Sequence, residues 1–217
     1  MAESASNKLK DQIDRLRNTT NESSQLARKV YLFFLLFSVY IAILVGSTTD
    51  EQLFRGIGAK LPILNVELPI AGTYMVVPLI FLFFHLNLLI LLYLLSQKLY
   101  TFSEHIEKLP QEQQDVEQKL LYPFPFTQTL VRKHRVWLDR ALFALMVNST
   151  LIVFPIALLL WAQVRFLPYH STLITWIHRT AVLGDFLLLL LLWPKTRSPN
   201  GQWLNWLGGT SNHRSAW

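Results

Sequence analysis

The chain has 217 residues, of which 52% are hydrophobic and only 16% are charged, whereas soluble domains carry about a quarter charged residues. It contains no cysteine, which excludes disulfides, thiol catalysis and cysteine-ligated zinc. The net charge of +6 could indicate a nucleic-acid partner. We expect no such partner, because the cytoplasmic loops of membrane proteins also collect Lys and Arg.

Residues 1–29 are mostly polar, so the apolar block that follows them does not have the position of a cleavable signal peptide. Within this segment Leu9, Ile13 and Leu16 recur at helical spacing, which predicts an amphipathic helix leading into the membrane. One interpretation is a partner-binding or coiled-coil segment. The favoured one is a solvated helix that extends the first membrane span.

Four apolar blocks are long enough to cross the hydrocarbon core, which takes about 20 helical residues. They are residues 30–47, 70–96, 141–164 and 172–193. The second block exceeds the minimum length, so we expect it to tilt or to project from the membrane. We therefore predict an all-α polytopic membrane protein, with a four-transmembrane-helix domain over residues 30–194.

The segments between the blocks are of different kinds. Residues 60–70 (KLPILNVELPI) contain two Leu-Pro pairs, which favour an ordered, non-helical loop. In the loop 97–140, residues 98–119 predict a solvated helix that continues the second span and is interrupted at Pro110. Residues 120–126 (LLYPFPF) are too aromatic for a free loop, so we expect them against the bilayer interface or the helix ends.

Two further segments could lie at the membrane surface. Arg132, Lys133 and Arg135 could contact anionic lipid headgroups, at about 1 kcal/mol per charge. The favoured interpretation of these residues is an ordinary determinant of topology. In the tail, residues 195–217, the sequence WLNWLGG at 203–209 predicts an interfacial segment.

The distribution of Lys and Arg predicts the orientation of the chain. Sixteen of them lie in the N-terminal segment, the 97–140 loop and the tail. The two remaining loops contain only Arg55, Lys60 and Arg165. Because cytoplasmic loops carry the excess of positive charge, we expect both termini in the cytoplasm.

Five polar residues lie within the predicted spans: His85, Asn87, Asn148, Arg179 and Asp185. From the rise of a helix, His85 and Asp185 both lie about 20 Å below the outer surface, and the two asparagines about 24 Å. We therefore predict a polar seam in which Asp185 faces His85 or Arg179. The seam is either a proton or ion pathway or a set of hydrogen bonds that stabilises the packing of the helices, which we call structural glue. Structural glue is favoured, because transporters usually contain internal repeats.

No catalytic motif is present: the sequence lacks a Walker loop, GxGxxG, HExxH and GxSxG. His170 and His178 lie near the outer interface without a set of partners that would predict a metal site. We therefore expect no enzymatic activity, no catalytic residues, no metal and no cofactor.

Several stretches together resemble the membrane region of bacterial pentapeptide-repeat membrane proteins. They are STTDEQLF (47–54), KLPILNVELPI (60–70), VPLIFLFFHLNLLILLYLL (77–95), LLYPFPF (120–126) and RFLPYHSTLITWIHR (165–179), followed by Asp185 and LLWP. The resemblance covers most of residues 30–194 and implies a protein of the bacterial inner membrane without assigned catalysis. In that family the membrane region precedes a β-solenoid of pentapeptide repeats. Residues 195–217 show no such repeat, so the chain is either truncated or a stand-alone version of the membrane region.

Two functions follow as alternatives. The leading one is a non-enzymatic inner-membrane module that anchors or assembles a partner at the cytoplasmic face, through the N-terminal helix and residues 98–139. The other is an oligomeric membrane effector that forms a pore or permeabilises the membrane, as in bacterial defence. Both have the lipid bilayer as a partner, together with either a protein partner or further copies of the chain.

Overall fold

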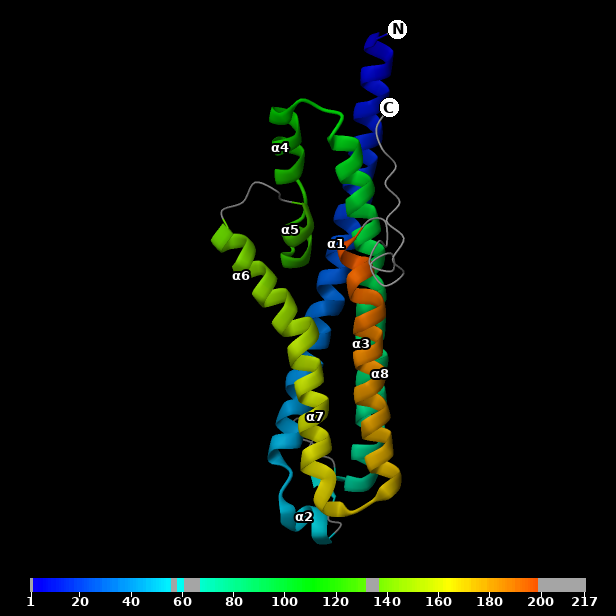
Figure 1. The fold of residues 1–217 in the computed structure, drawn as a ribbon, viewed down its shortest axis with the longest axis vertical. Helices are drawn as coiled ribbons and strands as arrows, with labels where there is room; N and C mark the ends of the chain where they lie inside the picture. The colour runs from blue at the N-terminus through cyan, green and yellow to red at the C-terminus, as the bar shows by residue number, and fades with distance from the viewer. Residues whose placement is uncertain (1, 56–57, 61–66, 132–136, 199–217) are drawn as a thin grey trace, which may run out of the picture.

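The computed structural model describes residues 2–55, 58–60, 67–131 and 137–198. Four helical stretches are long and apolar enough to cross a membrane: Asn7–Ser47, Ile70–Ile106, Trp137–Tyr169 and Thr172–Arg197. They lie side by side in one elongated bundle (Figure 1). The prediction of an all-α membrane protein with four spans is therefore confirmed.

The first span is part of a single helix, α1 (Ala2–Ser47), which continues without a break from the polar N-terminal segment. Helix α3 (Ile70–Ile106) is also longer than its apolar block, and it contains Pro78. Both helices extend past the other spans at the same end of the molecule (Figure 1). The length of α1 matches the prediction of a helix that extends the first span. Helix α3 likewise continues beyond its apolar block, and whether it tilts in the membrane or projects from it stays a prediction.

Two short helices lie beside these extensions. After a break at Pro110, which precedes its first turn, α4 (Gln111–Lys119) runs as the predicted solvated helix. The next helix, α5 (Pro125–Val131), begins within LLYPFPF and was not predicted. We refer to this end of the molecule as the α4 end.

The third span is not one regular α-helix. Helix α6 (Trp137–Asn148) is followed by the π-helical segment Ser149–Val153 and then by α7 (Phe154–Phe166). The Phe154 N–H donates to the Ser149 carbonyl, five residues back, which is the π-helical pattern. Pro155, next in the chain, has no N–H to donate. Helix α6 leans away from the bundle, whereas α7 runs along it (Figure 1).

The opposite end, the α2 end, contains the short connections. Helix α2 (Asp50–Arg55) follows α1 and begins with a capping box, in which Gln52 N–H donates to Thr49 Oγ1 and Thr49 N–H donates to Gln52 Oε1. The strands β1 (Ala59–Lys60) and β2 (Glu67–Leu68) pair antiparallel, and residues 61–66 between them lie outside the described part. The short η2 turn (Leu167–Tyr169) joins α7 to α8 (Thr172–Arg197).

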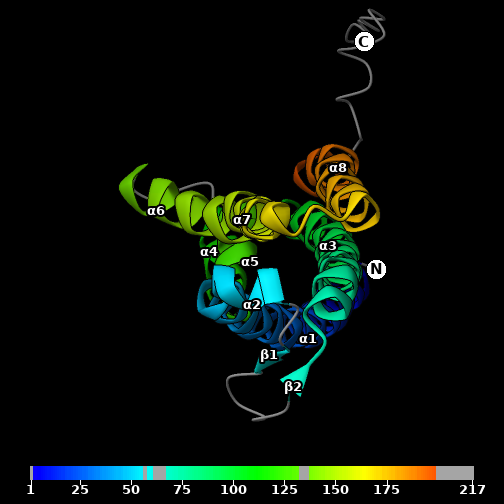
Figure 2. The same cartoon turned by 90° about the horizontal axis from the view of Figure 1, so that it is seen from below.

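In cross-section the four long helices form a ring, seen in Figure 2, in which α3 packs between α1 and α8 while α7 packs against α8 and α1. The interior contains large buried side chains such as Phe34, Phe81 and Leu88. Large apolar side chains also cover the outside of the bundle, including Leu36 and Phe83. An apolar exterior is what a lipid environment requires of a spanning helix.

Candidate functional site

A buried polar contact joins two of the spans inside the bundle. His85 on α3 and Asp185 on α8 meet there, with His85 Nδ1 2.5 Å from Asp185 Oδ1. Both side chains are completely buried. Next to Asp185, Gly184 brings α8 close to α3, because a Cβ at this position would lie 3.3 Å from Leu82 Cδ2. A small residue of this kind allows two membrane helices to approach closely.

Aromatic rings surround the His85–Asp185 pair. Phe34 on α1 stacks on the imidazole, with ring centroids 5.0 Å apart and planes 14° apart. Phe81 lies one turn from His85 on α3 and contacts both the imidazole of His85 and the ring of Phe34. Three helices therefore hold the histidine in place. His85 Nε2 and Asp185 Oδ2 are buried without a hydrogen-bond partner among the described residues.

The other three residues of the predicted seam do not join this pair, so the continuous seam is corrected to a pair. Asn87 is exposed on the outside of α3, because two helical steps of about 100° turn it away from His85. Arg179 is also exposed, and its guanidinium lies 5.3 Å from the centre of the Trp176 ring. Asn148 accepts a hydrogen bond of 2.9 Å from Arg197 at the end of α8.

His178 forms a second buried polar contact between α8 and α3, nearer the α2 end. Its Nε2 donates to the Tyr74 carbonyl at 2.7 Å, and its ring stacks with those of Tyr74 and Phe166. The exposed His170 contacts the Pro168 carbonyl instead. In the described ranges, no group of three or more His, Cys, Asp or Glu side chains is placed to hold a metal ion.

The side chain of Asn21 on α1 binds the segment that connects α4 to α5. Its Oδ1 accepts a hydrogen bond of 2.7 Å from the Tyr122 N–H, and its Nδ2 donates to the Leu120 carbonyl at 3.2 Å. Phe124 packs edge-on against Tyr31 of α1, and both Phe124 and Phe126 are buried. LLYPFPF therefore packs against α1 and, through the contact of Phe126 with Trp193, against the last turns of α8, while its place at a bilayer interface stays a prediction.

Asn21→Ala removes both of these bonds and is expected to cost about 1 kcal/mol of local stability, because the Tyr122 N–H loses its partner in a partly buried position. Amide hydrogen exchange over residues 120–131 should become faster, whereas the exchange rates of the α3 amides should not change. The control is Asn18→Ala, since Asn18 is exposed one turn earlier on the same helix. Equal exchange in both variants would show that Asn21 does not hold this segment.

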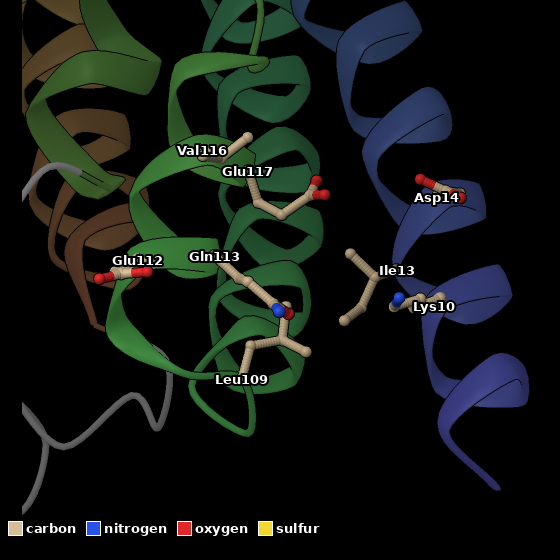
Figure 3. A pocket seen from close by; sticks show the side chains of 8 residues that line it. All are labelled: Lys10, Ile13, Asp14, Leu109, Glu112, Gln113, Val116 and Glu117. Atoms are coloured by element: carbon tan, nitrogen blue, oxygen red, sulfur yellow. The ribbon is translucent and has the colours of Figure 1, made fainter. Parts of the chain in front are cut away.

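Between the projecting part of α1 and α4 lies a groove of about 400 Å³ (Figure 3). It is lined by Lys10, Ile13, Asp14, Leu109, Glu112, Gln113, Val116 and Glu117. Arg17 joins the two sides, with its guanidinium 2.8 Å from Glu117 Oε2 and 2.7 Å from Asp14 Oδ1. Ile13 is buried, whereas Val116 is 55% exposed. The helical spacing of Leu9, Ile13 and Leu16 predicted an amphipathic helix, and Ile13 of this set lines the groove, but no sequence pattern predicted the groove itself.

The predicted lipid-contact residues Arg132, Lys133 and Arg135 and the segment 203–209 lie outside the described residues. A scan against protein-family models and searches of curated proteins and of solved structures give no match to this chain. The fold and these contacts are therefore the basis on which a function can be proposed.

Proposed function

We propose that this chain is a non-enzymatic module of the bacterial inner membrane that assembles a partner protein at the cytoplasmic face. The single observation that carries the proposal is the groove between α1 and α4. The excess of Lys and Arg in the segments at the α4 end favours a cytoplasmic location for the groove. The resemblance to the membrane region of pentapeptide-repeat proteins supports the bacterial inner membrane.

The lining of the groove favours a segment of a partner protein that carries an apolar side chain beside a basic one. Ile13, Leu109 and Val116 provide apolar surface, and burial of such surface is the usual source of affinity. Three carboxylates line the groove against one Lys. Asp14 and Glu117 are both bound by Arg17, so Glu112 is the carboxylate available to a Lys or Arg of the partner.

In this proposal the membrane spans position the groove and do not conduct ions. The His85–Asp185 pair then stabilises the packing of α3 against α8, as polar contacts between membrane helices do. Helices α1 and α3 fix the groove relative to the membrane spans, because each is one continuous helix from the spans to the α4 end.

A photo-crosslinking amino acid at Gln113, which lines the groove, tests the proposal in cells of the native host. The control position is Asp115, which is exposed on the same helix and is not part of the lining. We expect a discrete product of higher mass from position 113, absent from position 115. Adding Ile13→Glu, which places a charge on the apolar wall, should reduce that product at least tenfold.

The mass of the product distinguishes the two kinds of partner. A product equal to 25.2 kDa plus the mass of a different protein supports the assembly module. A product at a multiple of 25.2 kDa would instead identify a second copy as the occupant and would favour the oligomeric membrane effector. Products of equal yield from positions 113 and 115, or none from either, would contradict a role of the groove.

A further inference from the structure

We infer that two copies of this chain pair in the membrane through the outer face of α3, with the Asn87 side chains of the two copies hydrogen-bonded to each other. In the ring, α3 lies between α1 and α8, and its outer side faces away from the bundle (Figure 2). We call this face the Asn87 stripe. It consists of Val76, Ile80, Phe83, Asn87, Ile90 and Leu94. The stripe shares no residue with the groove, so the inference is independent of what the groove binds.

Asn87 is a polar side chain exposed on a part of α3 that lipid surrounds. It lies within the apolar block 70–96, on the outside of the bundle. Among the described residues, no hydrogen bond of its carboxamide is found. This group has two N–H donors and an acceptor oxygen, and the hydrocarbon core contains no water to bind them. Asn87 therefore requires a polar partner from another molecule in the membrane.

The residues of the stripe have the spacing of a face that pairs with another helix. Steps of four and three residues alternate along α3 from Val76 to Leu94. The apolar members are all exposed, from 41% for Ile90 to 63% for Phe83. In a left-handed pair of helices, this alternation keeps one face against the partner over the whole contact. A single Asn within such a face fixes the register and the number of copies.

The symmetry of two inserted copies places Asn87 opposite Asn87. Copies that cross the membrane in the same direction are related by a twofold axis along the membrane normal, so equal residues lie at equal depth. The two α3 helices then run parallel, and the two carboxamides meet. Because a carboxamide both donates and accepts, each side chain is the hydrogen-bond partner of the other. Lipid is a sufficient neighbour for the apolar members of the stripe but not for Asn87, so a second copy is the favoured occupant.

Arg179, the other exposed residue of the predicted seam, has no such requirement. It lies nearer the outer surface, and its guanidinium lies over the Trp176 ring. A long basic side chain near a membrane surface also extends to the headgroups. Asn87 has a short side chain inside the apolar block, and it extends to neither surface. The requirement for a partner within the membrane is therefore specific to Asn87.

Disulfide crosslinking of single cysteines, in lipid vesicles that contain only the purified full chain, tests which face pairs. The chain has no cysteine of its own. Phe83→Cys and Ile90→Cys flank Asn87 on the stripe, and the control is Leu183→Cys on α8, at a position that is 60% exposed outside the stripe. We expect oxidation to give a product of twice 25.2 kDa from both stripe positions and only traces of it from the control. Equal yields from all three positions, or no product from the stripe, would overturn the inference.

Energy transfer between donor-labelled and acceptor-labelled copies in the same vesicles, over a range of lipid-to-protein ratios, measures the dissociation constant of the pair. Asn87→Leu keeps the stripe apolar but loses the hydrogen bonds between copies, so we expect the dissociation constant to rise about tenfold. Asn87→Gln retains a carboxamide and should restore most of the affinity. The unfolding of single copies in micelles should be the same for Asn87→Leu and the unmodified chain, so a weaker pair would not reflect a damaged fold. An unchanged dissociation constant in Asn87→Leu would overturn the inference.

A photo-crosslinking amino acid at Phe83, in cells of the native host, distinguishes a second copy from a different membrane protein. A product of twice 25.2 kDa supports the pair of copies. A product of any other mass would place the helix of a different protein on the stripe and would overturn the inference. Because position 83 lies outside the groove, this result is separate from that of the crosslinker at Gln113.

Discussion

Replacing His85 by leucine is expected to lower the free energy of unfolding by about 3–5 kcal/mol, because it leaves a buried carboxyl without its partner. Replacing His85 and Asp185 together by leucine should recover most of this loss, to within about 1–2 kcal/mol of the unmodified chain. Leucine fills a similar volume, and the double variant buries no polar group at the pair. Titration with sodium dodecyl sulfate in mixed micelles, followed by tryptophan fluorescence, measures these differences.

The matched control for the first variant is Asn87→Leu. Asn87 lies two residues from His85 on the same helix but is exposed on the outside of the bundle, so its replacement should change stability by less than about 0.5 kcal/mol. A loss in His85→Leu no larger than that in Asn87→Leu would show that the His85–Asp185 pair does not fasten α3 to α8. A double variant that is additive in its two losses would show the same.

Phe34→Ala is expected to have the next largest effect, with a loss of about 3 kcal/mol. Phe34 is almost completely buried and contacts both His85 and Phe81, so its truncation leaves a cavity where α1 meets α3. Lipid tails solvate apolar groups well, so the loss comes from packing and not from exposure to water. The same unfolding titration measures it.

Phe83→Ala provides the comparison, because Phe83 has the same side chain but is 63% exposed on the outside of α3. Lipid can replace most of its contacts, and we expect a loss of about 1 kcal/mol or less. If the two alanine variants unfold at the same concentration of detergent, the packing of α1 onto α3 around Phe34 does not contribute to stability as the structure indicates.

The number and approximate position of the spans could be predicted from the sequence because the requirement is one of length. About 20 apolar residues are needed to cross the hydrocarbon core, and each block meets or nearly meets this value. The ends of the helices were less predictable, since polar residues can continue a helix beyond the membrane. Helices α1 and α3 both do so, and α8 continues past Pro194 to Arg197.

The polar seam could be predicted only in part, for a physical reason. The helical rise places His85 and Asp185 at the same depth, and the structure brings these two together. Which residues face each other depends on the rotation of each helix. Spans that are apolar on every side contain little information about that rotation. Asn87 accordingly has a depth close to that of His85 but lies on an outward-facing side, and Arg179, which is nearer the outer surface, is exposed as well.

The groove and the short helices beside it depend on contacts between distant parts of the chain. Asn21 and Arg17 bind residues about a hundred positions further on, at Tyr122 and Glu117. No local pattern marks such partners. The start of α2, in contrast, has a local signal, because the Thr49-to-Gln52 spacing is that of a capping box.

The central claim, that the groove faces the cytoplasm, is tested most directly by labelling single cysteines in intact spheroplasts of bacterial cells with a membrane-impermeant maleimide. The chain has no cysteine of its own, so Asp115→Cys on α4 and Glu51→Cys at the α2 end each provide a unique target. Both positions are exposed. We expect Glu51→Cys to be labelled in spheroplasts, and Asp115→Cys only after the membrane is opened. Labelling of Asp115→Cys in intact spheroplasts would contradict a cytoplasmic groove and, with it, the proposed assembly function.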